Sequence, residues 1–184
     1  MTRPVVLAAP SAGPRDLRSL FDRIEADFGA VSSVIALGDA ALALRAPEVS
    51  AWSVAEQVDH LVKVNQSIFS HLLTRTPASG PRISLAGRLV LLTGYFPRGK
   101  GESPRKLRGQ PASAAELSAA LETSRDTFRK LAAEPGPLLD PSPALPHKMF
   151  GALTAAQALR FVPIHTRHHL RIVSDIRAAA RRQH

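Results

Sequence analysis

The 184-residue sequence predicts an all-α protein, and three observations support this class. Four segments repeat apolar residues at the helical spacing i, i+3, i+4, i+7. Three of these segments begin with Ser or Thr, followed three residues later by Glu or Gln, which is the capping-box pattern of a helix start. No segment alternates apolar and polar residues as a half-buried strand does. The expected architecture is a four-helix bundle, with a long crossover between helices two and three that carries a short extra helix.

The first helix is expected from about residue 14 to residue 44, after a flexible N-terminus at residues 1–13. Its apolar stripe consists of Leu17, Leu20, Phe21, Ile24, Phe28, Val31 and Ile35. Pro14 suits a first helical turn, and Gly38 is the expected break in this segment. Residues 14–184 are expected to form a single helical bundle domain, because this length suits one buried core.

Capping boxes and helix breakers set the bounds of the other three helices. The three boxes are Ser53–Glu56, Ser113–Glu116 and Thr154–Gln157. The second helix is expected to end near Thr74, because Pro77 and Gly80 follow it. The turn at residues 135–137 ends the third helix. Pro163 lies inside the fourth helix and is expected to kink it or to loosen one turn.

A long connection, residues 77–112, joins the second and third helices. A loop of this length rarely lacks structure of its own. Residues 83–96 are apolar enough for a short helix that lies over the bundle, and residues 97–111 are expected to form irregular surface.

Composition excludes several classes of protein. The sequence has no cysteine, which rules out disulfide frameworks, thiolate zinc sites and a cysteine nucleophile. No apolar run is long enough to span a bilayer, so no membrane partner is expected. The first fifteen residues are too weakly apolar for a secretory signal, and a cytoplasmic location is the expectation.

The net charge of +9 raises the question of an anionic partner such as nucleic acid. The basic residues are scattered between a loop and the C-terminal tail rather than clustered on one helix. One Trp and one Tyr do not provide a platform on which bases could stack. We therefore interpret the charge as a solvated basic surface and do not expect nucleic acid as a partner.

The fourth helix carries the most informative residues, two histidines one turn apart. Its apolar face is formed by Phe161, Val162, Ile172, Val173 and Ile176. His165 and His169 fall in the middle of this face, and the spacing i, i+4 places their rings side by side. Two buried imidazoles both need polar partners, and one cation serves both, so a metal site is favoured over hydrogen bonds to carbonyls or waters. His168 lies on the shoulder of the face, either as an alternative ligand or at the mouth of a pocket.

His60 is placed less clearly by its own helix. The apolar stripe of the second helix leaves His60 on a flank, beside Gln57 and Val64. Periodicity therefore does not assign His60 to the metal. His71 points the same way, but it lies about 16 Å further along the helix and cannot share an ion with His60. Neither His71 nor His184 is assigned to the site.

Three motifs resemble the DinB-like (YfiT-like) superfamily. Residues 52–61 resemble the start of that family's second helix, where a Trp, a capping hydroxyl and, eight residues after the Trp, a His-Leu pair recur. Residues 165–169 resemble the His-x-x-x-His pair of its last helix. Residues 147–154 resemble a subgroup with a His-x-x-Phe-Gly segment before the last helix, although Lys148 stands where that subgroup commonly has Pro.

The resemblance implies a divalent metal, zinc or nickel, held by His60, His165 and His169. Three protein ligands leave positions open to a substrate, as in catalytic sites. The first hypothesis is a thiol-dependent S-transferase or isomerase that acts on a small-molecule substrate with a low-molecular-weight thiol. Arg98, Lys100 and Arg105 are candidates to contact an anionic thiol, although a solvated basic loop is the favoured interpretation of these residues.

Two alternatives remain open from the sequence. A metal-dependent hydrolase would use metal-bound hydroxide and a general acid or base, with His147, Glu56 and Asp59 as catalytic candidates. Each also has an ordinary role, because Glu56 caps a helix, Asp59 faces solvent and His147 pins the turn before the last helix. The second alternative is a non-catalytic metal-binding or stress-associated bundle, and a homodimer is left open.

Overall fold

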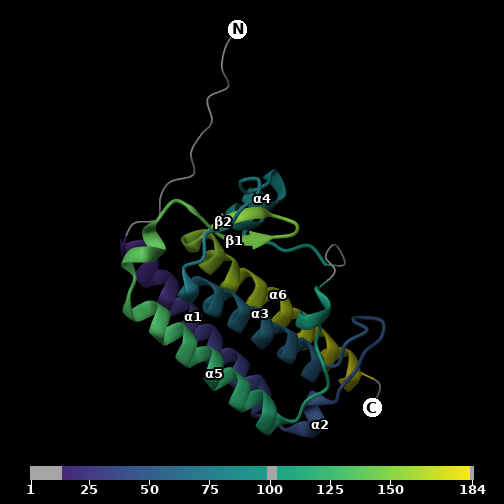
Figure 1. The fold of residues 1–184 in the computed structure, drawn as a ribbon. Coiled ribbons are helices and arrows are strands. Elements are labelled where there is room, and N and C mark those ends of the chain that lie inside the picture. The colour runs from purple at the N-terminus through teal and green to yellow at the C-terminus, as the bar shows by residue number, and fades with distance from the viewer. Residues whose placement is uncertain (1–13, 99–102, 183–184) are drawn as a thin grey trace.

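A computed structural model describes residues 14–98 and 103–182, and this part of the chain is mostly helical, in agreement with the predicted all-α class (Figure 1). The four longest helices are α1 (Pro14–Ile35), α3 (Val54–Thr74), α5 (Ala114–Ala133) and α6 (Ala155–Arg181). Helix α3 packs against α5 and α6, and α1 packs against the same two helices. The predicted flexible segment, residues 1–13, lies outside the described residues. None of the described helices is long and apolar enough to cross a membrane.

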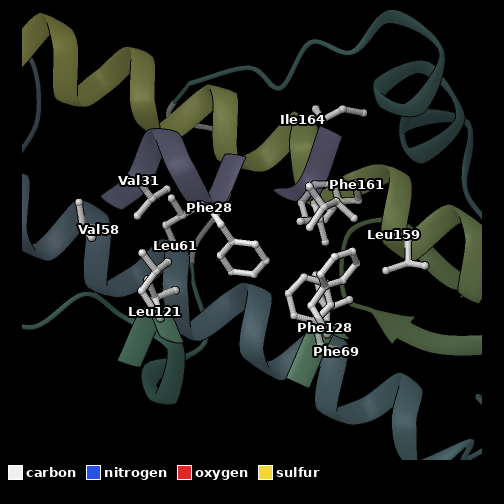
Figure 2. Close-up of a cluster of buried hydrophobic side chains, with 14 of the residues drawn as sticks. Phe28, Val31, Val58, Leu61, Phe69, Leu121, Phe128, Leu159, Phe161 and Ile164 are labelled. Carbon is white, nitrogen blue, oxygen red and sulfur yellow. The ribbon is translucent and has the colours of Figure 1, made fainter. Parts of the chain in front are cut away.

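Three phenylalanines from three different helices meet in the interior (Figure 2). The Phe69 and Phe128 ring centroids are 5.3 Å apart, and Phe28 lies 5.9 Å from Phe128. All three side chains are at most 3% exposed. Aromatic side chains of this size contribute much of the apolar area that stabilises a core. The apolar stripes predicted for the helices therefore face one another across a common interior.

The helix starts and stops lie where the sequence predicts them. All three capping boxes are present, with the hydroxyl of the first residue accepting from the backbone N–H three residues on. Helix α3 ends at Thr74, followed by Arg75 in the left-handed conformation. Gly38, at φ 84°, breaks the first predicted helix into α1 and the short α2 (Asp39–Leu42). Helix α6 continues through Pro163.

The long connection contains the extra helix that the sequence predicts, α4 (Leu85–Thr93). The segment predicted to be irregular also contains one 3₁₀ turn, η1 (Arg105–Leu107). The chain after η1 lies against the start of α3, where the Gln110 N–H donates to Asp59 Oδ2 at 2.7 Å. Gly109 is buried at this contact, against the backbone of Glu56. This part of the connection is therefore fixed to the N-terminal turns of α3.

The expectation that the chain contains no strand is wrong, because two short strands form an antiparallel hairpin before α6. They are β1 (Pro143–His147) and β2 (Gly151–Thr154), and they follow the 3₁₀ turn η2 (Gly136–Leu139). Two prolines and the absence of β-branched residues make β1 unlike a strand in sequence. The hairpin is held by the segment before α4, since the Ala152 N–H donates to the Pro81 carbonyl at 2.8 Å. In Figure 1 the hairpin and α4 lie beyond one end of the long helices, and α2 lies at the other.

We predict that Gly109→Ala destabilises the protein. An ideal Cβ at Gly109 would lie 1.9 Å from the Glu56 carbonyl oxygen, so the loop would have to move off α3. Overpacking of this kind costs about 1–3 kcal/mol, which lowers the melting temperature of a chain of this size by roughly 2–12 °C. Differential scanning calorimetry measures the effect.

Gly29→Ala is the matched control, because nothing lies within 4 Å of a Cβ at this helical position. Alanine in a helix interior is about 0.5–1 kcal/mol more favourable than glycine, so this variant is expected to melt at or above the wild-type temperature. A Gly109→Ala variant that also melted there would show that the loop does not pack against α3 as described.

Candidate metal centre

Three histidines from two helices meet in the interior. His60 comes from α3, and His165 and His169 come from α6; they are 4%, 5% and 8% exposed. One ring nitrogen from each lies within 4.8 Å of the other two, an arrangement that can hold a metal ion. The ring centroid of His60 is 5.2 Å from that of His165 and 4.7 Å from that of His169.

The two helices contribute to the cluster in different ways. His165 and His169 are one turn apart on the buried face of α6, as their spacing predicts, and their ring centroids lie 4.4 Å apart. His60 lies on the flank of α3 that periodicity gives it, and that flank is also buried. Helix α3 packs against both α5 and α6, and η1 covers its N-terminal half.

Hydrogen bonds set the tautomers of two of the rings. His60 Nδ1–H donates to the Leu107 carbonyl at 2.6 Å, and His169 Nδ1–H donates to Gln57 Oε1 at 2.6 Å. The Gln57 amide is itself oriented, since its Nε2 donates to Ser50 Oγ at 2.9 Å. Carbonyl and amide oxygens only accept, so both Nδ1 atoms carry the proton and both Nε2 atoms keep a lone pair. Metal-binding histidines are oriented in this way by partners beyond the ligands.

The third ring completes a donor set that fits a metal. His165 Nε2 lies 3.1 Å from His169 Nε2. Two nitrogens bound at about 2.05 Å to one tetrahedral ion would be about 3.3 Å apart. His165 Nδ1 is buried and has no hydrogen-bond partner, so no hydrogen bond from Nδ1 orients this ring as it does the other two. Imidazole nitrogens suit zinc, copper, iron and nickel.

Burial keeps all three histidines neutral near pH 7. Burial lowers the pKa of His165 well below its usual value, and the neighbouring histidines lower it further. Burial, followed by the charges of His60 and His168, lowers the pKa of His169 to about 2. Burial also lowers the pKa of His60 and outweighs the opposing effect of the hydrogen bond to Leu107. Neutral imidazole is the form that binds metals.

A cavity of about 580 Å³ opens onto the three histidines. Its lining includes Trp52, Phe96, Leu107, Leu145, Met149, Phe161 and Ile172. The Trp52 ring is 5.1 Å from the His60 ring, and the Phe161 ring is 5.2 Å from the His165 ring. Mostly apolar walls with a few converging polar groups are typical of small-molecule sites.

His168 and His147 also line this cavity, outside the group of three. The half-buried His168 ring lies 5.0 Å from the ring of His169. His147 Nδ1 accepts from the Met149 and Phe150 N–H groups at 3.2 and 3.3 Å. His147 therefore pins the hairpin turn, and its proton sits on Nε2. Burial lowers the pKa of His147.

The predicted acidic candidates are not in the lining of the cavity. Glu56 accepts from the Ser53 N–H at 2.7 Å in its capping box and pairs with Arg45 at 2.7 Å. Asp59 pairs with Lys63 and holds the loop through Gln110.

The predicted basic loop residues divide into three cases. Arg98 pairs with Asp175 at 2.6 Å, and Arg105 is exposed. Lys100 lies outside the described residues. His71 is remote from the cluster, as expected, and binds the Ala144 carbonyl at 2.8 Å.

Sequence reasoning missed two groups that orient the ligands. Gln57 precedes His60 by three residues, and its position beside His60 on the flank of the helix was the available signal. The Leu107 group is a backbone carbonyl, and no side-chain pattern marks it.

The fold and the site define a class: a helical protein whose buried trio of histidines can hold a metal ion. The sequence model of the DinB superfamily matches residues 11–173. The chain therefore belongs to the DinB superfamily. No curated protein and no solved structure matches the chain. The subgroup with the His-x-x-Phe-Gly segment stays a prediction.

We predict that the metal-free protein loses stability as the pH falls from 7 to 5. Below about 6.5 the unfolded chain binds protons at histidines that stay neutral in the folded state, so unfolding is favoured by up to about 1.4 kcal/mol per pH unit for each histidine. Asp27 acts in the opposite direction, because burial raises its pKa to about 6. Urea unfolding of chelator-treated protein at several pH values measures the sum.

The three buried histidines are expected to outweigh the single carboxyl. In the control variant Asp27→Asn, the loss of stability towards low pH should become steeper, because the opposing contribution is removed. A metal-free wild type whose free energy of unfolding stayed constant or rose between pH 7 and 5 would contradict the buried, neutral state of the cluster.

Proposed function

We propose that this chain is a metal-dependent enzyme that binds zinc or nickel through His60, His165 and His169 and acts on a small molecule as an S-transferase or isomerase that depends on a low-molecular-weight thiol. The observation that carries the proposal is the convergence of three neutral ring nitrogens at one wall of a cavity of about 580 Å³. The proposed scaffold is a four-helix bundle in a single domain, residues 14–184. A homodimer and a cytoplasmic location stay predictions.

The ligand set supports a catalytic site over a structural one. Structural zinc sites in proteins are closed by four protein ligands, whereas catalytic sites have three and keep a position open. Here three histidines converge, and the cavity reaches all three. An open position would therefore face the space in which a substrate can lie.

The absence of cysteine is compatible with a thiol that comes from a cofactor. A bound divalent ion lowers the pKa of a thiol, which makes it a nucleophile near neutral pH. The chain has no cysteine of its own, which is compatible with a thiol supplied by a small molecule. Leu107 and Gln57 orient the rings of His60 and His169, and aromatic side chains form part of the cavity wall. His147 supplies an N–H donor from the wall of the cavity.

Hydrolysis is supported less well by the side chains in the cavity. A hydrolase needs a general acid or base within reach of the reacting water. Glu56 and Asp59 are occupied by a helix cap, ion pairs and a loop N–H, and neither lines the cavity. His147 is the remaining candidate, and its Nδ1 is already bonded to the hairpin turn.

We predict that the protein binds one zinc or nickel ion per chain and that any one of His60→Ala, His165→Ala and His169→Ala weakens binding by at least 100-fold. Each variant removes one of three ligands. Gln57→Leu is expected to weaken binding by about 10–100-fold, the usual effect of losing a partner that orients a ligand. Isothermal titration calorimetry of metal-stripped protein measures the affinities.

His71→Ala is the matched control, because His71 lies on the same helix as His60 and its ring binds the Ala144 carbonyl instead. This variant should bind metal as the wild type does. A wild type that retains neither ion after reconstitution, or a His71→Ala variant as defective as His165→Ala, would refute the metal site.

We further predict that glutathione, used as a probe thiol, raises the melting temperature of the metal-loaded protein. At 100 times its dissociation constant a ligand adds about 2.7 kcal/mol, a shift of roughly 5–11 °C for a chain of this size. S-methylglutathione cannot form a thiolate and serves as the control. Equal shifts with both compounds would contradict thiol binding at the metal, and no shift with glutathione or with a panel of other small thiols would favour the hydrolytic or non-catalytic alternative.

A further inference from the structure

A second, smaller hollow lies beside the cavity of the metal centre. It has a volume of about 120 Å³, and its polar lining consists of three arginines, Arg98, Arg167 and Arg171, together with His168 and Tyr95. Tyr95 and Arg98 come from the loop after α4, and the other three come from α6. The hollow therefore collects positive charge from two segments that meet over the outer side of α6.

The positive charge in this hollow is only partly balanced by the protein around it. Arg98 pairs with Asp175, and Arg167 interacts electrostatically with Asp27. Within residues 14–98 and 103–182, no salt bridge involves Arg167 or Arg171. Arg167 and Arg171 are one turn apart on α6, a spacing at which like charges destabilise a helix by a few tenths of a kcal/mol. An anion between the guanidinium groups would remove this repulsion.

The hollow adjoins the metal centre. Phe96 and His168 line both the hollow and the large cavity. The His168 ring is 5.0 Å from the His169 ring, and the Phe96 ring is 6.3 Å from the His165 ring. These two shared side chains place the hollow directly beside the cavity.

We propose that this hollow binds the anionic group, a carboxylate or a phosphate, of the molecule whose reacting end lies at the three histidines. Guanidinium groups present a planar fork of N–H donors that matches both kinds of oxyanion. The small volume suits one such group rather than a whole substrate. The placement of the reacting end at the three histidines rests on the proposed function. The oxyanion site itself can be tested without it.

The site differs from the basic loop that the sequence suggested. Arg98 belongs to it, Arg105 does not line the hollow, and the main contribution comes from Arg167 and Arg171 on α6. In the sequence these two arginines lie opposite the apolar face and look like ordinary solvated charges. They become a candidate site because a loop that is remote in the sequence brings Arg98 beside them.

The test uses the full-length, metal-stripped protein with inorganic phosphate and acetate as separate probes at constant ionic strength. Phosphorus NMR and calorimetric titration measure saturable binding. The variant Arg167→Gln/Arg171→Gln should raise the dissociation constant of the preferred probe at least tenfold. Tighter binding of phosphate than of acetate would identify the group as a phosphate, and the reverse would identify it as a carboxylate.

The control is Arg160→Gln/Arg181→Gln, which removes the same charge from exposed positions on the same helix that do not line the hollow. It should bind the probe within twofold of the wild type. The single variant Arg171→Gln, at an exposed position, guards against a folding defect in the double variant, and it should show part of the loss. Equal loss in the control, no loss in Arg167→Gln/Arg171→Gln, or no saturable binding by the wild type would overturn the proposal.

Zinc affinity, measured on the same variants, separates this proposal from the metal centre. Arg167→Gln/Arg171→Gln should bind zinc as the wild type does. Oxyanion binding without any zinc binding would refute the proposed function and leave the oxyanion site standing. If the wild type binds zinc but no oxyanion, only the oxyanion site is refuted.

Discussion

The packing of α3 against α6 is the constraint on which the rest of the site depends. It brings His60 to the pair His165 and His169, and it removes all three from water. Removal from water lowers the pKa values of the three histidines. The rings therefore stay neutral and keep lone pairs that can bind a metal ion. The same packing buries three polar side chains in an apolar interior, which costs stability unless a partner satisfies them. The candidate metal centre and its cost in stability therefore both come from the packing of α3 against α6.

Hydrogen bonds to groups beyond the cluster orient two of the three histidines, His60 and His169. The Leu107 carbonyl belongs to the long connection, which reaches α3 only because Gly109 has no side chain to keep it away from Glu56. Gln57 holds His169 across the helix interface, and Ser50 holds Gln57. The Leu107 carbonyl, which is remote from His60 in the sequence, thus decides which nitrogen of His60 carries the proton.

The parts of the fold that depend on residues close together in the sequence could be predicted from it. The capping boxes, the break at Gly38 and the paired rings of His165 and His169 are all local in origin. His60 could not be placed by periodicity, because its burial depends on the tertiary cover of η1. The hairpin was not predicted, because its proline-containing strand lacks a strand-like sequence and because the hairpin is held by contacts with Pro81, which is remote in the sequence. The Leu107 carbonyl has no signature, since every residue has one.

The neutrality of the ligands has a consequence for charge balance. Three imidazoles and the amide of Gln57 carry no charge, and no Asp or Glu is among the described residues that line the cavity. A divalent ion held there would keep both of its positive charges in a space with apolar walls. An anionic ligand such as a thiolate would cancel one of these charges, and an uncharged ligand would cancel none. Such a site favours an anion for electroneutrality alone, and by linkage the anion tightens the hold on the ion as much as the ion tightens the hold on the anion.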